Sequence, residues 1–264
     1  MIESVRKKQP LVHHITNQVV MNFTANGLYA LGAAPVMAHA KEEVEEMATV
    51  ANALVLNIGT LTAEQIEAMI IAGKAANRAG TPIVLDPVGV GATSFRTESA
   101  RRILDEVDIQ MIRGNAGEVA SLAGITMDVK GVDGAEGVDG VALASKAYEI
   151  LNVPLAITGE TDVLIDDHEK MTISNGDAML TKVTGSGCLL SSVIASFLAV
   201  EQTLFSAANA VGFYGIAAER ATEQARHPGQ FQIALLDQLH QVSGQDVEKH
   251  IRLSKQFIGQ GDHV

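Results

Sequence analysis

The chain of 264 residues has one cysteine, no tryptophan and only 4% aromatic residues. A single cysteine, Cys188, excludes an intrachain disulfide and any metal site built from several cysteines. Because aromatic side chains are so few while apolar residues make up 47% of the chain, the core must be filled mostly by Ala, Val, Ile, Leu and Met. The composition is therefore that of a folded protein with a large aliphatic core.

Long apolar runs and an excess of positive charge are also missing. The longest helical apolar stretch, residues 189–200, is shorter than the roughly 20 residues that cross a bilayer, and serines interrupt it. No apolar segment follows the basic residues near position 7, which argues against a signal peptide. The formal net charge of −12 disfavours nucleic acid and anionic membranes as partners. We expect a soluble cytoplasmic protein whose ligands are small molecules.

The stretch Thr181–Cys188 is the strongest candidate for a binding site. We interpret it as a glycine turn that follows a short β-type run and leads into a helix opened by Gly187 and Cys188. Gly185 and Gly187 allow a tight turn whose N–H groups point into one concavity, and the helix end adds its positive dipole. Such a pocket suits a transferring phosphoryl group. A turn that merely joins a strand to a helix has the same local sequence, so the motif alone leaves both interpretations open.

Apolar strand-like runs and helical patterns alternate along the chain. We expect strands over residues 33–38, 53–58, 82–86, 108–112 and 154–158, and helices over 20–31, 41–51, 62–80, 115–124, 141–151, 203–224 and 230–242. Residues 162–166 and 170–174 are typical of a hairpin, 130–140 of a glycine-rich loop and 259–264 of a loose tail. This pattern predicts an α/β fold: one domain over residues 1–264, with a mostly parallel central sheet and helices on both faces.

Ligands of parallel sheets bind at the carboxyl ends of the strands. Six residues are expected at such ends, and we predict that they converge: Met37, Gly59, Asp86, Arg113, Thr158 and Gly185. Asp86 either caps backbone N–H groups or reaches Mg²⁺ directly or through water. Arg113 has two donors for phosphate oxygens.

Several candidate residues have structural alternatives. Glu118 follows Asn115 at the spacing of a capping box, so it either closes a helix end or orients Mg²⁺ and its waters. Asn17 either bonds backbone or faces a ligand. His13 and His14 have no third metal ligand at a known spacing, which favours packing or surface histidines.

Cys188 itself has three interpretations. It is a nucleophile, which requires a nearby histidine base, or a base that accepts the proton of an alcohol, or a buried inert thiol. A helix N-terminus lowers the pKa of a thiol from about 8.5, which would help the first two roles.

Taken together, these stretches resemble the hydroxyethylthiazole kinase family of the ribokinase-like group. The resemblance covers about residues 14–200 and rests on the segments His14–Asn17, Asn22–Gly27, Pro35–Met37, Leu56–Thr60, Asp86–Gly89, Arg113–Asn115, Ile157–Gly159 and Val183–Cys188. Relatives in the wider group usually carry Asp at the position of Cys188, so the cysteine favours this family over its neighbours.

The resemblance implies ATP- and Mg²⁺-dependent phosphorylation of the hydroxyl group of 4-methyl-5-(2-hydroxyethyl)thiazole in thiamine biosynthesis and salvage. It also implies a homotrimer with active sites at subunit interfaces. The resemblance further implies that Cys188 is the catalytic residue and that Met37, Gly185 and Asn17 contact the thiazole substrate. It implies that Arg113 and Thr158 contact ATP and that Asp86 and Glu118 lie beside the metal.

Three alternatives stay open at this point. One is a related vitamin or sugar kinase, for example one acting on hydroxymethylpyrimidine, against which Cys188 argues. Another is a cysteine hydrolase, which would need a positioned histidine and no ATP. The third is a nucleotide-binding protein without catalytic activity.

Overall fold

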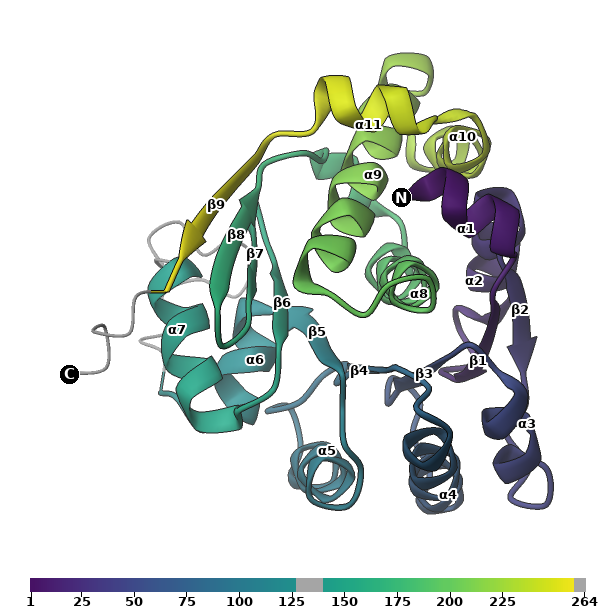
Figure 1. The fold of residues 1–264 in the computed structure, drawn as a ribbon, viewed down its shortest axis with the longest axis vertical. Helices are drawn as coiled ribbons and strands as arrows, with labels where there is room; N and C mark the ends of the chain where they lie inside the picture. Colours follow the sequence, from purple (N-terminus) through teal and green to yellow (C-terminus); the bar gives the residue numbers. More distant parts are fainter. Residues whose placement is uncertain (127–139, 259–264) are drawn as a thin grey trace.

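The computed structural model describes residues 1–126 and 140–258. Its described part contains one nine-stranded sheet in the order β2-β1-β3-β4-β5-β6-β7-β8-β9 (Figure 1). The first six strands in this order pair in parallel, and β6 to β9 pair antiparallel. The strands are β1 Leu11–Ile15, β2 Ala34–Met37, β3 Ala53–Asn57, β4 Ile83–Asp86, β5 Met111–Asn115, β6 Leu155–Thr158, β7 Asp162–Ile165, β8 Glu169–Ile173 and β9 Leu253–Phe257.

Helices cover both faces of this sheet, as the α/β pattern predicted (Figure 1). One face carries α1 Ile2–Lys8, α2 Met21–Leu31, α8 Ser186–Leu198, α9 Leu204–Gln224, α10 Pro228–Gln241 and α11 Gly244–His250. The other carries α3 Val44–Val50, α4 Ala63–Ala79, α5 Ser94–Glu106, α6 Ala116–Leu122 and α7 Gly140–Leu151. A 3₁₀ helix, η1 Ala178–Lys182, precedes α8.

The core is divided in two by the sheet, because successive side chains of a strand point to opposite faces. In β3, Val55 packs into the cluster under α8 and α9, while Leu54 and Leu56 pack into the cluster under α4. All five β3 residues are buried. A strand buried on both sides reads as a continuous apolar run, which is why the sequence revealed the central strands clearly.

Most predicted elements are present, but some boundaries were wrong. The strand expected over residues 108–112 is β5, Met111–Asn115, because residues 112–115 pair with β6. The helix expected over 41–51 begins only at Val44. The glycine-rich segment and the tail lie outside the described residues, apart from Gly140, which begins α7.

Five α-helices and strands were not predicted: α1, β1, α5, α11 and β9. His13 and His14 interrupt the apolar run of β1, and the apolar patterns of the other four are weak. α5 buries only Ser99, Ala100 and Ile103, and β9 is exposed over most of its length. In the described part of the chain, no helix combines the length and the apolar character needed to cross a membrane.

Candidate active site

The glycine turn begins α8, as predicted, but it does not follow a strand. Gly185 is the N-cap of α8 and has φ 87°, a left-handed conformation that favours glycine. The 3₁₀ helix η1 precedes it, so the expectation that Gly185 lies at a strand end was wrong. A Cβ added to Gly185 would lie 2.7 Å from Val20, so both the backbone conformation and the space require glycine here.

Two hydrogen bonds hold this turn in place. The buried Tyr214 hydroxyl of α9 donates to the Ser186 carbonyl at 2.8 Å, and Ser186 Oγ donates to the Leu180 carbonyl at 2.7 Å. The N–H groups at the start of α8 are therefore presented by a rigid turn, which suits binding of an anion.

Arg113 lies directly against this helix end. A Cβ added to Gly187 would lie 2.6 Å from Arg113 Nη1, so a side chain at this position would displace the guanidinium. Arg113 Nη2 donates to Thr158 Oγ1 at 2.7 Å. Arg113 is the third residue of β5 rather than its end, because the strand extends to Asn115. A fixed cation and the dipole end of α8 thus face the same region.

Asp86 ends β4 beneath this region and is fully buried. Its Oδ2 accepts hydrogen bonds from Asn57 Nδ2 at 2.7 Å and from Ser191 Oγ at 3.0 Å. Its Oδ1 lies 3.8 Å from Arg113 Nη1 and has no hydrogen-bond partner in the described part of the chain. Burial raises the pKa of Asp86, and the Arg113 charge opposes that shift.

The Cys188 thiol lies in the first turn of α8 and contacts two asparagines. Its Sγ accepts from Asn57 Nδ2 at 3.2 Å and from Asn17 Nδ2 at 3.7 Å. Burial, followed by the negative charge of Asp86, raises the pKa of the thiol to about 12. The expectation that the pKa is lowered was therefore wrong, because desolvation and a neighbouring carboxylate both disfavour the thiolate.

Glu118 forms the capping box that its spacing predicted, and it also contacts a site loop. Its Oε2 accepts from the Asn115 backbone at 3.0 Å, while Asn115 Oδ1 accepts from the Glu118 backbone at 2.9 Å. The other oxygen, Oε1, accepts from Gly89 N at 2.9 Å, in the loop that follows Asp86. The two interpretations of Glu118 are thus compatible, since the cap places its carboxylate beside that loop.

With this geometry in place, comparison with known proteins identifies the family. The family model described as "Hydroxyethylthiazole kinase family" matches residues 2–245. The chain is also 53% identical over 258 residues to a hydroxyethylthiazole kinase of Halalkalibacterium halodurans, with 96% of this chain and 99% of that protein covered. The chain belongs to the hydroxyethylthiazole kinase family.

Solved structures agree with this family assignment. A hydroxyethylthiazole kinase protein from Pyrococcus horikoshii OT3 superposes with a TM-score of 0.88 at 41% identity, with 96% of each chain covered. A ribokinase-like superfamily protein from Enterococcus faecalis V583 superposes with a TM-score of 0.65 at 11% identity, covering 91% of this chain and 94% of that one. The second likeness shows the fold alone, and it supports the predicted ribokinase-like architecture.

Not every residue implied by the family resemblance joins the cluster. Met37 is the half-buried last residue of β2, the edge strand, and pairs in register with His14. His13 and His14 are buried. The interpretation that they pack in the interior is therefore confirmed, and the alternative that they lie on the surface is wrong. Met37 therefore lies at the same edge of the sheet as the other site residues but apart from them.

Asn57 and Ser191 are site residues that the sequence analysis missed. Asn57 pairs in register with Asp86, so the rule that found Asp86 at a strand end would also have found Asn57. Ser191 lies three positions after Cys188, so the two side chains share one face of α8.

Arg96 was missed because α5 was not predicted. Its Nη1 donates to the carbonyls of Ile58 and Val88, both at 2.8 Å, and its Nη2 donates to the Gly59 carbonyl at 2.7 Å. One guanidinium thus ties together the loops that follow β3 and β4.

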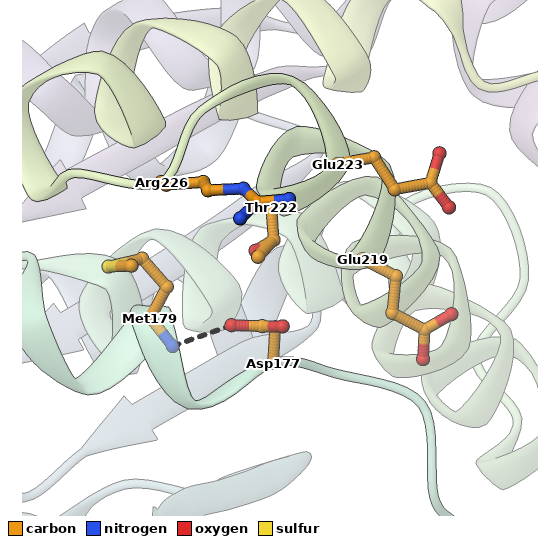
Figure 2. Close-up of a pocket in the computed structure, with 6 residues that line it drawn as sticks. All are labelled: Asp177, Met179, Glu219, Thr222, Glu223 and Arg226. Atoms are coloured by element: carbon orange, nitrogen blue, oxygen red, sulfur yellow. Dashed lines mark hydrogen bonds between the residues drawn. The ribbon is translucent and has the colours of Figure 1, made fainter.

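A cavity of about 380 Å³ lies between η1 and the end of α9 (Figure 2). It is lined by Asp177, Met179, Glu219, Thr222, Glu223 and Arg226. None of the residues predicted for the site lines this cavity. Its three carboxylates and single cation make it unfavourable for a triphosphate, whereas the start of α8 offers N–H groups and Arg113.

Proposed function

We propose that this chain transfers the γ-phosphoryl group of ATP to the hydroxyl group of 4-methyl-5-(2-hydroxyethyl)thiazole at the N-terminus of α8. Membership of the hydroxyethylthiazole kinase family supports the reaction. We infer the location of the reaction from the Arg113 guanidinium, which packs against Gly187. Phosphoryl transfer depends mainly on positioning and on stabilising charge, and a cation beside a row of helical N–H groups supplies both.

The chain's own residues suggest a division of roles. Arg113 and Thr158, which are hydrogen-bonded to each other at 2.7 Å, are suited to hold ATP phosphates. Asn17 and Gly185 flank Cys188 and are suited to hold the thiazole alcohol. We assign Met37 to the same substrate on the family resemblance, as a contact made across a subunit interface.

A magnesium ion fits the donor set of this site. Asp86 Oδ1 is a buried carboxylate oxygen without a hydrogen-bond partner among the described residues, and such an oxygen is suited to a cation. Mg²⁺ needs only one or two carboxylates when phosphates and waters complete its shell. Asp86 would hold the ion directly, and Glu118, which already accepts two backbone N–H groups, would act through waters. The ion, when bound, would neutralise phosphate charge.

Cys188 is proposed to contact the reacting hydroxyl as a neutral thiol. With its pKa raised to about 12, it is protonated at neutral pH and cannot serve as an efficient base. The alcohol proton need not leave early, because the transition state of phosphoryl transfer is loose. Cys188 therefore helps to position the alcohol, while Arg113 and the start of α8 stabilise charge.

The direct test is ADP formation with a panel of alcohols. Purified protein, ATP and several divalent metals are combined with the thiazole alcohol, with hydroxymethylpyrimidine, or with no acceptor. We expect ADP and a phosphate monoester with the thiazole alcohol in the presence of Mg²⁺. A folded protein that gives no thiazole-dependent ADP with any of these metals would reject the proposal.

A further inference from the structure

Every hydrogen-bonding group of the Asn57 side chain is engaged. A side-chain amide has two N–H donors and two lone pairs on its oxygen. Asn57 Oδ1 accepts from Asn17 Nδ2 at 2.8 Å and from Gly59 N at 3.0 Å, while Nδ2 donates to Asp86 Oδ2 at 2.7 Å and to Cys188 Sγ at 3.2 Å. The residue is 2% exposed, so water does not compete for these contacts.

The partners determine which way the amide points. The backbone N–H of Gly59 can only donate, so the Asn57 oxygen must face it. The amide nitrogen then faces Asp86 and Cys188. The sulfur is thereby an acceptor toward Asn57, and its own S–H hydrogen must point elsewhere.

We infer that Asn57 is a positioning residue that sets the separation of Asp86 and Cys188 and links both groups to Asn17. This inference rests on the proposed function, because it assigns those three residues to one reaction site. Asn57 would act through the groups it aligns, since its four bonds leave it no free donor or acceptor for a substrate.

The thiol provides a test that needs no kinase activity. Cys188 is the only cysteine of the chain, so alkylation by iodoacetamide reports on it alone. Asn57→Leu preserves side-chain size but removes the donor to the sulfur. Because a donated hydrogen bond favours the thiolate, which is the reactive form, we expect alkylation to slow by at least about threefold.

If Asn57 had a purely structural role, Asn57→Leu would change the alkylation rate in the opposite direction. Loosening the pocket would expose the thiol and accelerate alkylation. Asn57→Ser retains one donor and should react at a rate between those of the wild type and Asn57→Leu, which simple steric blocking would not produce. Asn57→Ser also serves as the test variant if Asn57→Leu does not fold. The matched control is Asn52→Leu at the opposite end of β3, where Asn52 bonds Leu11 N at 2.8 Å and is exposed; its alkylation rate should not change.

Steady-state kinetics supply the second readout. Misplaced catalytic groups lower kcat by about 100-fold, so Asn57→Leu should show a loss of this order with the KM for ATP changed less than about threefold. Alkylation at or above the wild-type rate, or kcat within about threefold of wild type, would overturn the inference. If the wild type phosphorylates no alcohol while alkylation slows as expected, the proposed function fails and the alignment of the thiol by Asn57 stands.

Discussion

Arg113 Nη1 lies 3.8 Å from Asp86 Oδ1, too far for a hydrogen bond, although both side chains are largely buried. Two of their atoms, Asp86 Oδ1 and Arg113 Nε, have no hydrogen-bond partner among the described residues. Buried polar atoms without partners cost free energy. Under the proposed function, both residues would gain partners when phosphate and a cation bind, which makes them the best targets for testing the nucleotide site.

Arg113→Ala and Thr158→Ala should both weaken ATP binding. Loss of a charged hydrogen-bond donor costs about 1.5–3 kcal/mol, and loss of the neutral Thr158 hydroxyl should cost about 1 kcal/mol. Isothermal titration calorimetry with a non-hydrolysable ATP analogue measures both affinities. Arg78→Ala is the control, since Arg78 forms an exposed ion pair with Glu45 on α3. Unchanged nucleotide affinity in both test variants would contradict the proposed ATP contacts.

Two substitutions at Cys188 distinguish positioning from base catalysis. If Cys188 were the base, Cys188→Ser would lose much of the activity, because a hydroxyl is a far weaker base than a thiol. With the thiol pKa raised to about 12, that reason disappears, and we expect kcat to fall less than about tenfold. Cys188→Asp should also retain substantial activity, since a carboxylate can accept the alcohol proton.

Steady-state kinetics and mass spectrometry during turnover test this view of Cys188. We expect no phosphorylated cysteine. A phosphorylated Cys188 would establish a covalent route instead. A much larger loss of kcat in a folded Cys188→Ser variant that binds both substrates normally would instead support Cys188 as the base.

Stability should fall as the pH drops below about 6.5, partly because of His14. This residue is fully buried between the Val12 carbonyl and Ser192 Oγ, and burial lowers its pKa to about 3. Between these two pH values the unfolded chain binds a proton that the folded chain excludes. Each such proton lowers the free energy of unfolding by up to about 1.4 kcal/mol per pH unit.

His14→Gln should reduce that pH dependence. Urea unfolding from pH 7 to pH 5 measures the slope, and a residual slope is expected because burial also lowers the pKa of His13 and His39. His168→Gln is the control, since the His168 side chain is 80% exposed. Equal slopes in the wild type and His14→Gln would show that His14 does not contribute.

Arg96→Met should destabilise the loops that carry the site. The substitution leaves three carbonyls without their charged donor, which costs about 1.5–3 kcal/mol. Urea unfolding measures the loss, and Arg101→Met, an exposed residue of the same helix, is the matched control. If both variants unfold like the wild type, Arg96 does not stabilise these loops.

The protein should be a trimer in solution. The motivation is the family resemblance together with the half-buried apolar segment Pro35–Met37 on the edge strand β2. Light scattering at micromolar concentration should give three times the protomer mass of 27.8 kDa. Met37→Asp should favour the monomer, while Phe257→Asp at the opposite edge of the sheet should not. A monomeric wild type would leave Met37 without an interface role.

The sequence by itself determined the architecture and predicted much of the candidate site. Strands buried on both faces give continuous apolar runs, and local signals mark helix ends, as in the capping box of Thr62 and Gln65. Asp86 and Thr158 could be predicted because strand ends in a parallel sheet meet at one edge. Elements with few buried side chains, such as α5, have no clear apolar pattern in the sequence. Arg96 was missed because it lies in α5.

Only the tertiary structure decided how these residues act together. The pairing of β5 with β6, not its apolar run, set the end of β5 and placed Arg113 inside the strand. The sequence around Cys188 shows a helix N-terminus, which lowers the pKa of a thiol. The fold adds burial and the carboxylate of Asp86, contributed by a distant strand, and together they raise that pKa. Local conformation follows from neighbours in sequence, whereas desolvation and charge depend on neighbours in space.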